Sequence, residues 1–266
     1  MPTVKLVLAY DGTRYVGWQV QPNGPSIQAE LERALATLHK EPVRVTGAGR
    51  TDAGVHALGQ VASARIASSI ARTSLGQALN ALLPPDIRVL SVEDAPADFN
   101  ARFAARSKTY RYRIVNAAVM SPFERRFAWH VPRVLDAGAM GDAAAMLAGR
   151  HDFAAFQAAG GVASTSTRTL YRSRWLEQAP PGIEGGRILT YEVSGDGFLR
   201  HMVRNIVGTL VEVGTGRRAP ASMAEVLASR DRAAAGPTAP AHGLCLVRVD
   251  YDAGHAREGG SAGGGG

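Results

Sequence analysis

Apolar residues recur along the chain with two different periods, and the order of these periods restricts the fold more than any other feature. Thr3 to Tyr10 alternates and is rich in Val and Leu, which predicts a strand. Ser26 precedes apolar residues at helical spacing, which predicts a helix that opens there. The same reasoning predicts the remaining elements of the first half, namely strands over Pro42 to Thr46, Gln60 to Ile66 and Ile87 to Val92, and a helix from about Ser74 to Pro84. This order fits a split β-α-β layout.

The second half repeats this mixture of strands and helices. Lys108 to Val115 alternates, so that Tyr110 and Tyr112 share one strand face while Arg111 and Arg113 share the other. The further predicted elements are helices over Asp136 to Gly149 and Phe198 to Val213, a helix from Ser222 with Glu225 completing a capping box, and strands over Thr169 to Glu177, Arg187 to Val193 and Leu244 to Val249. We therefore predict two similar α/β subdomains, residues 1–105 and 106–252, followed by a glycine-rich and disordered tail, residues 253–266.

Positive charge is concentrated in one part of the chain. The formal net charge is +7, and most of the excess lies between Asp98 and Arg133, where arginine outnumbers lysine. Concentrated cations indicate a polyanionic partner, and nucleic acid is the first candidate. Because an arginine-rich and alanine-rich composition also arises in GC-rich genomes, composition alone leaves the partner open.

Composition also bears on the compartment and on cofactors. A helix needs about 20 consecutive apolar residues to cross a bilayer, and no apolar run in this chain approaches that length. The N-terminal segment also lacks the apolar stretch of a signal peptide. We therefore expect no membrane association. The single cysteine, Cys245, cannot form an internal disulfide, which favours a reducing cytoplasm. The 7 histidines are scattered without metal-ligand spacing. We expect no metal and no cofactor.

One short glycine-rich segment displays a single carboxylate. Gly47 to Ala57 places Asp52 among small residues, with Arg50 two positions before it and His56 four positions after it. Glycines permit sharp turns and the close approach of a ligand or another backbone, and a lone carboxylate there suits covalent or charge-stabilising chemistry. Aspartate and glycine are also ordinary turn residues, and local composition alone favours that interpretation.

Two other residues are candidates for chemistry, and each has a simpler interpretation. Tyr110 lies on a strand crowded with cations, where its ring could stack on a base or its hydroxyl could move a proton. A half-buried sheet tyrosine is the commoner case. Arg204 projects from an amphipathic helix, where charged residues usually form a solvated face.

Considered together, the motifs along the chain identify a family more specifically than any one of them does. The chain resembles the tRNA pseudouridine synthase A family over nearly its whole length, from Thr3 to about Tyr251. The matching motifs occur in the family's order and are Tyr10-Asp11-Gly12-Thr13, Gly17-Trp18-Gln19, Gly49 to Ala57, Phe99 to Phe103, Lys108 to Tyr112, Gly149 to Phe153, Phe198 to Gly208 and Gly243 to Leu246. Departures at Asn100, Arg200 and Cys245 are minor, and none touches the expected catalytic group.

The resemblance implies a fold and a reaction. The fold would be α+β, with a mixed, mainly antiparallel central sheet flanked by helices and an active-site cleft between the subdomains. The enzyme would isomerise uridine to pseudouridine in RNA, with Asp52 as the catalytic aspartate. Asp52 would either attack covalently or promote a glycal-type intermediate. Arg204 would pair with Asp52 and keep it ionised and oriented.

The resemblance also implies substrate contacts and partners. Tyr110 would stack against the target base and assist in proton transfer, and Leu244 would pack near that base. The expected RNA contacts are Arg50, His56, Arg111 and Arg113. The substrate would be the anticodon stem-loop of tRNA, at positions 38, 39 and 40, and the protein would act as a homodimer.

Two alternatives remain open from sequence. The chain could be a non-catalytic tRNA-binding protein or chaperone on the same scaffold, although its intact Asp52, Tyr110 and Arg204 argue against this. It could also be a hydrolase, such as a nucleosidase, that uses Asp52 as its carboxylate.

Overall fold

Ten strands form one continuous mixed sheet in a computed structural model, which describes residues 1–67, 70–160, 164–179 and 185–251. The strand order is β4-β1-β3-β10-β5-β9-β8-β7, with β2 paired to β3 and β6 paired to β5. All pairings are antiparallel except β3 with β10 and β5 with β6. The predicted α+β class and mainly antiparallel sheet are confirmed. Among the residues in these ranges, no helix has the length and apolar character that crossing a membrane requires.

The first half forms one end of the sheet and its helical cover. Its elements are β1 (Thr3–Tyr10), η1 (Gly12–Arg14), α1 (Ile27–His39), β2 (Val45–Gly47), β3 (His56–Arg65), α2 (Arg72–Leu82) and β4 (Ile87–Ala95). Val4, Leu6 and Leu8 alternate along β1 and are fully buried in the core that also contains α1. The Ser26 hydroxyl accepts a hydrogen bond from the Ala29 amide and caps α1, as the sequence predicts.

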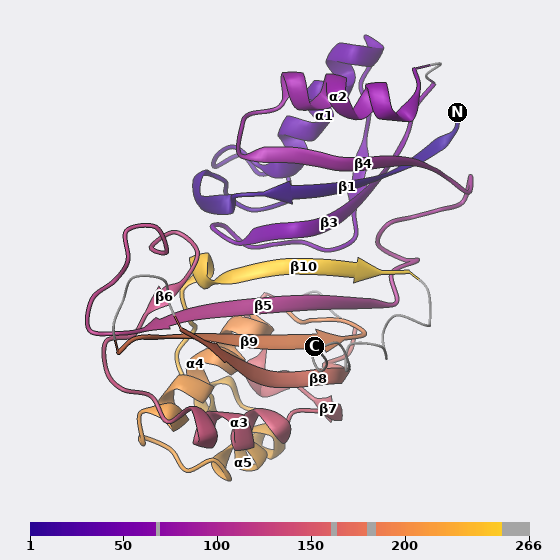
Figure 1. Ribbon diagram of the computed structural model, residues 1–266. Helices are drawn as coiled ribbons and strands as arrows, with labels where there is room; N and C mark the ends of the chain where they lie inside the picture. The colour runs from indigo at the N-terminus through magenta and orange to yellow at the C-terminus, as the bar shows by residue number, and fades with distance from the viewer. Residues whose placement is uncertain (68–69, 161–163, 180–184, 252–266) are drawn as a thin grey trace, which may run out of the picture.

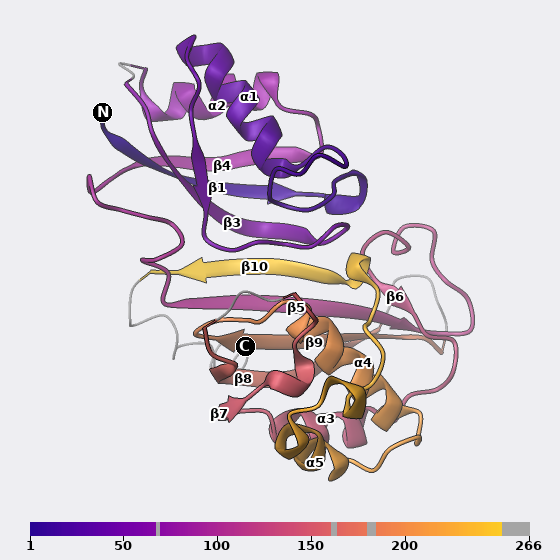
Figure 2. The ribbon, with the colours of Figure 1, turned by 180° about the vertical axis from the view of Figure 1, so that it is seen from behind.

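The second half forms the other end of the same sheet. Its elements are β5 (Ser107–Asn116), β6 (Trp129–His130), α3 (Ala137–Ala145), β7 (Gly149–Asp152), η2 (Ala154–Phe156), β8 (Thr167–Gln178), β9 (Arg187–Gly195), α4 (Met202–Gly214), α5 (Ser222–Ser229), η3 (Arg232–Ala234), η4 (Ala241–Gly243) and β10 (Leu244–Asp250). Figures 1 and 2 show α1 and α2 beside the strands of the first half, and α3, α4 and α5 beside those of the second.

The last strand joins the two halves. β10 lies between β3 and β5 in both views (Figures 1 and 2). It runs parallel to β3 over two residue pairs, Cys245 with His56 and Leu246 with Ala57. Leu246 also faces Tyr110 across the antiparallel β10–β5 pair. One row of residues therefore connects the start of β3 to the middle of β5.

Three local predictions differ from the structure. The helix expected from Phe198 begins only at Met202, because His201 adopts a left-handed backbone conformation with φ 60°. The predicted capping box at Ser222 is absent: Ala221 is the cap residue, and the Ser222 hydroxyl donates to the Ala219 carbonyl. The helix expected over Asp136 to Gly149 spans only Ala137–Ala145. The predicted tail from residue 253 lies outside the described residues.

We expect α4 to depend on a glycine where another backbone crosses it. A Cβ at Gly208 would lie only 1.7 Å from the Pro237 carbonyl oxygen, so Gly208→Ala forces the crossing segment away. We predict a loss of about 1–3 kcal/mol in the free energy of unfolding, measured by urea denaturation. Gly141→Ala in α3 is the matched control, because no atom lies within 4 Å of the place that its Cβ would take. Equal stability of the two variants would contradict this packing account.

Candidate active site

The loop that carries Asp52 is fixed by the segment after β1. The Trp18 amide donates to the Thr51 carbonyl at 3.0 Å, and the Gly54 amide donates to the Tyr15 carbonyl at 3.3 Å. The hydroxyls of Tyr10 and Thr51 share a hydrogen bond at 2.9 Å. These contacts hold the backbone on both sides of the carboxylate.

Glycine is required where this supporting segment touches the loop. Gly17 has φ +112°, a conformation that L side chains rarely adopt, and a Cβ there would lie 2.5 Å from the Thr51 carbonyl oxygen. A Cβ at Gly12 would lie 2.0 Å from the Val55 carbonyl oxygen. The two glycines of the first sequence motifs therefore allow the close backbone packing that positions Asp52.

The Asp52 carboxylate meets two nitrogen groups from the start of α4. Arg204 Nη1 donates to Asp52 Oδ2 at 3.3 Å, and His201 Nε2 lies 3.4 Å from the same oxygen. The Asp52 side chain keeps 32% of its surface exposed, so it remains accessible from solvent. The structure thus brings Asp52 and Arg204 together, although 152 positions separate them in the sequence.

A second hydrogen bond fixes the Arg204 guanidinium. Its Nε donates to the Ala239 carbonyl at 2.8 Å, in the segment that leads into β10. The amide of Ala239 in turn donates to the Arg204 carbonyl at 3.1 Å. The arginine is therefore held on both its backbone and its side chain while its outer nitrogen reaches Asp52.

Tyr110 lies on the sheet row that begins beside the Asp52 loop. Only 7% of its surface is exposed, and its ring packs edge-on against Phe198 with centroids 5.0 Å apart. Burial raises the pKa of Tyr110 above its ordinary value, and the charge of Asp52 raises it further. The tyrosine is therefore a neutral phenol, which suits stacking and opposes a role as a phenolate base.

Leu244 and Leu246 line the same side of β10. Leu246 pairs with Tyr110, whereas Leu244, the predicted base contact, pairs with Tyr112 one step along the strand. Both leucines are buried. Leu246 is thus the β10 residue directly opposite the candidate tyrosine.

His56 does not lie on the surface, contrary to its predicted contact with RNA. The imidazole is 5% exposed. Its Nδ1 accepts from the Gly12 amide at 3.1 Å, and its Nε2 contacts the carbonyls of Arg126 at 2.9 Å and His242 at 3.2 Å. Both ring nitrogens are occupied by the protein, so His56 ties three segments together behind the Asp52 loop. This burial depends on tertiary contacts that the local sequence does not reveal.

The predicted arginine contacts divide between two places. Arg50 is exposed beside the Asp52 loop. Arg111 and Arg113 point away from Tyr110, and they pair with Glu192 at 2.8 Å and with Glu124 at 2.9 Å. Arg111, Arg172 and Arg174 all bind Glu192; although burial opposes its ionisation, these hydrogen bonds hold the pKa of Glu192 below its ordinary value. The outer arginines are thus engaged in ion pairs within the sheet.

Two residues near the site were not predicted. Lys108 shares the strand face of Tyr110, and its Cε lies 3.1 Å from where a Cβ on Gly49 would stand. Burial lowers the pKa of Lys108, and the neighbouring Arg102 and Arg168 lower it further. The strand alternation around Tyr110 already contained this signal. His201 is the other such residue, and its position three before Arg204 was the available signal.

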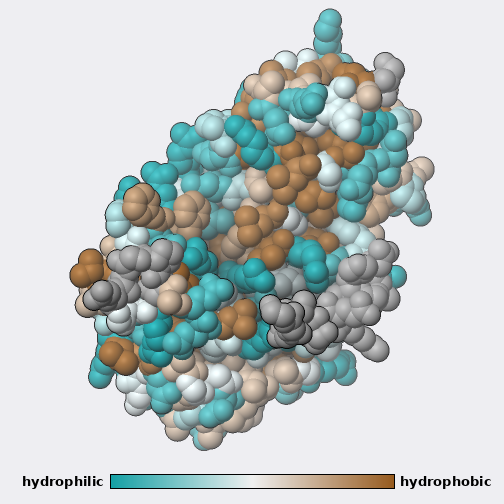
Figure 3. Space-filling model, viewed as in Figure 1, coloured by the Kyte–Doolittle hydropathy of each residue, from teal (hydrophilic) through white to brown (hydrophobic). Residues whose placement is uncertain are grey.

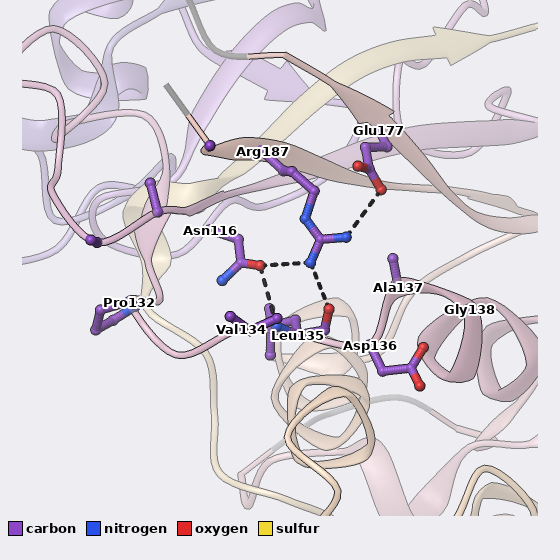
Figure 4. Close-up of a pocket in the computed structure, with 12 residues that line it drawn as sticks. Asn116, Pro132, Val134, Leu135, Asp136, Ala137, Gly138, Glu177 and Arg187 are labelled. Carbon is purple, nitrogen blue, oxygen red and sulfur yellow. Dashed lines mark hydrogen bonds and ion pairs between the residues drawn. The ribbon is translucent and has the colours of Figure 1, made fainter. Parts of the chain in front are cut away.

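A hollow of about 740 Å³ lies elsewhere, near the N-terminus of α3. Figure 4 shows Arg187 in this hollow, between Asn116 and Glu177. Its guanidinium donates to the Asn116 side chain at 3.0 Å and to the Leu135 carbonyl at 2.6 Å. The arginine is used to connect β9 with the chain before α3, and none of the residues around Asp52 lines this hollow. We assign it a structural role.

The site around Asp52 offers one accessible carboxylate, one fixed guanidinium and a neutral aromatic wall. Such a carboxylate can attack an electron-poor carbon or stabilise positive charge that develops on a sugar ring. Within the described ranges, no group of three or more His, Cys, Asp and Glu side chains could hold a metal ion.

Comparison with known proteins gives consistent matches. A sequence profile described as tRNA pseudouridine synthase matches residues 6–104 and 143–252. The tRNA pseudouridine synthase A of Geobacter sulfurreducens is 49% identical over 94% of this chain and 100% of its own length. Those of Myxococcus xanthus and Moorella thermoacetica are 50% and 47% identical, over 94% of this chain and 92% and 100% of their lengths.

Acid should destabilise the protein partly through His56. Burial lowers the pKa of His56 in the folded protein, against the opposing charge of Asp11. The unfolded chain therefore binds this proton more readily. The stability contributed by the neutral imidazole is complete above its unfolded pKa of about 6.5 and is lost as the pH falls through the folded value. We expect His56→Gln to have a shallower decline in the free energy of unfolding between pH 7 and 5, measured by urea denaturation. An unchanged decline would contradict this assignment.

Proposed function

Because the chain belongs to the tRNA pseudouridine synthase family, we propose that it isomerises uridine to pseudouridine in tRNA with Asp52 as the catalytic carboxylate. The observation that carries this proposal is the contact of Asp52 Oδ2 with Arg204 Nη1, beside the buried Tyr110. In this proposal, three residues from three distant segments supply a carboxylate, an orienting cation and a wall for the base.

The reaction moves a bond within one nucleotide. The N-glycosidic bond breaks, the uracil turns, and its C5 bonds to the same sugar carbon; the proton lost from C5 is balanced by the proton that N1 gains once it is free of the sugar. Asp52 serves either by covalent attack or by promoting a glycal-type intermediate. The exchange is redox-neutral and releases no part of the base, so the balance requires no external reactant.

Arg204 and Tyr110 would have separate tasks. Arg204 orients the carboxylate, because its own position is fixed by Ala239. Tyr110 presents a ring against which the displaced uracil can stack. Extrusion of the base from its helix costs roughly a few kcal/mol, and this stacking offsets part of that cost. Its raised pKa argues against proton abstraction by its phenolate.

We propose the anticodon stem-loop, at positions 38, 39 and 40, as the substrate region. Arg50 and Lys108 are the cations beside the Asp52 loop that suit phosphate contacts. Arg111 and Arg113 remain predicted tRNA contacts, on the other face of the sheet. Acceptance of several neighbouring positions would require recognition of tRNA shape more than of base sequence.

We also propose a homodimer that acts in the cytoplasm. Figure 3 shows apolar residues gathered over β4, β1 and β3 on the face without helices. Leu58 in β3 and Leu90 in β4 are each 59% exposed. A second copy would remove this apolar surface from water. Within each copy, we place the division between the two subdomains near residue 105.

The catalytic role of Asp52 is tested by an isosteric change. Asp52→Asn keeps the side-chain shape but removes the carboxylate charge and nucleophile, so we expect binding of tRNA within about threefold of wild type and loss of at least about 1000-fold in pseudouridine formation. The measurement is formation of pseudouridine at each uridine of an anticodon stem-loop that carries uridines at positions 38, 39 and 40 and elsewhere in the loop.

The same assay separates the alternatives. Wild-type protein that binds tRNA and leaves every uridine unchanged would support a binding protein or chaperone. Release of free uracil would support a hydrolase. If pseudouridine forms only at uridines outside positions 38 to 40, the proposed substrate region is wrong and the proposed reaction still holds.

The dimer proposal is tested by adding charge to the exposed apolar strands. Leu58→Asp places a carboxylate on this surface, and we expect it to shift the protein from dimer to monomer in light scattering, because burial of an unpaired charge is costly. Val134→Asp is the control, since Val134 is also highly exposed but lies before α3. A monomeric wild-type protein, or a dimer that survives Leu58→Asp, would contradict the proposed interface.

A further inference from the structure

His201 has an unusual backbone. Its φ of 60° and ψ of 2° lie in the left-handed region, which residues other than glycine seldom adopt. Hydrogen bonds hold this conformation on both sides: the Ala158 amide donates to the Arg200 carbonyl at 3.0 Å, and the Asn205 amide donates to the His201 carbonyl at 2.9 Å. A residue kept in a costly conformation by its surroundings is often one whose side chain must point in a particular direction.

The direction in this case is toward Asp52. His201 Nε2 lies 3.4 Å from Asp52 Oδ2, the oxygen that also receives Arg204 Nη1 at 3.3 Å. Among the described residues, the ion-pair and hydrogen-bond contacts of this carboxylate group all involve Oδ2. Oδ1 is therefore the oxygen left to meet a substrate.

The imidazole is surrounded by charged groups from several segments. These groups are Asp52 in its loop, Arg200 before α4, Arg204 in α4 and Arg232 in η3. Burial lowers the pKa of His201, the charge of Asp52 opposes this effect, and the three arginines lower the pKa further. The imidazole Nε2 is therefore a second polar contact at Asp52 Oδ2, while Arg204 supplies the hydrogen bond and the positive charge at the same oxygen.

We propose that His201 is a positioning residue, whose imidazole Nε2 lies against Asp52 Oδ2 and holds the carboxylate so that Oδ1 faces the sugar carbon of the target uridine. This inference rests on the proposed function. Two directions of contact fix a carboxylate rotamer better than one, and small misplacement of a reacting group can cost large factors in rate. His201 acts through Asp52 and does not itself contact the reacting atoms.

Two substitutions separate the side chain from the backbone. His201→Gly adopts the left-handed conformation without strain but has no donor. His201→Gln places an amide nitrogen at about the position of the histidine Nε2. We expect the single-turnover rate constant for pseudouridine formation to fall about 10- to 100-fold in His201→Gly and to recover to within about fivefold of wild type in His201→Gln. We expect the dissociation constant for tRNA to stay within about threefold in both.

Lys40→Gly is the matched control, because Lys40 is another left-handed residue, with φ 55°, at the end of α1. Its single-turnover rate constant should equal that of wild type. Equal rates for His201→Gly and wild type would overturn the proposal, as would an equal loss in the glycine and glutamine variants. A loss in tRNA affinity or melting temperature that parallels the loss in rate would also overturn it. Wild-type protein that forms no pseudouridine would instead refute the proposed function.

Discussion

The short parallel pairing of β3 with β10 is the constraint on which the rest of the molecule depends. Only two residue pairs define it, yet it joins the two halves into one sheet. It also aligns Ala57, at the start of β3, with Leu246 and hence with Tyr110. Because the Asp52 loop ends where β3 begins, this alignment sets the loop beside the tyrosine of the other half.

The candidate site is consequently assembled from parts that are rigid for separate reasons. Backbone hydrogen bonds and glycine contacts fix the Asp52 loop, the crossing chain at Ala239 fixes Arg204, and sheet packing fixes Tyr110. Side chains that are already held in place lose little freedom when a substrate binds.

Local patterns predicted much of this architecture. The Ser26 cap and the alternation of β1 depend on neighbouring residues alone, so the sequence was sufficient for both. The pairing of Asp52 with Arg204 was available only from the family resemblance, because no local rule joins residues so far apart. His56 was misjudged since its three partners come from separate segments, and the left-handed turn at His201 arises from contacts on both sides that a helical period cannot show.

The position of β10 has a consequence for synthesis of the protein. β3 and β5 are complete by residue 116, but the strand that must lie between them ends at residue 250. Until β10 leaves the ribosome, both neighbours carry open edges, which are prone to pair with other chains. Arg204 likewise lacks the Ala239 carbonyl that orients it. A nascent chain therefore has its carboxylate loop long before it has a site, and the site forms only after β10 has been made.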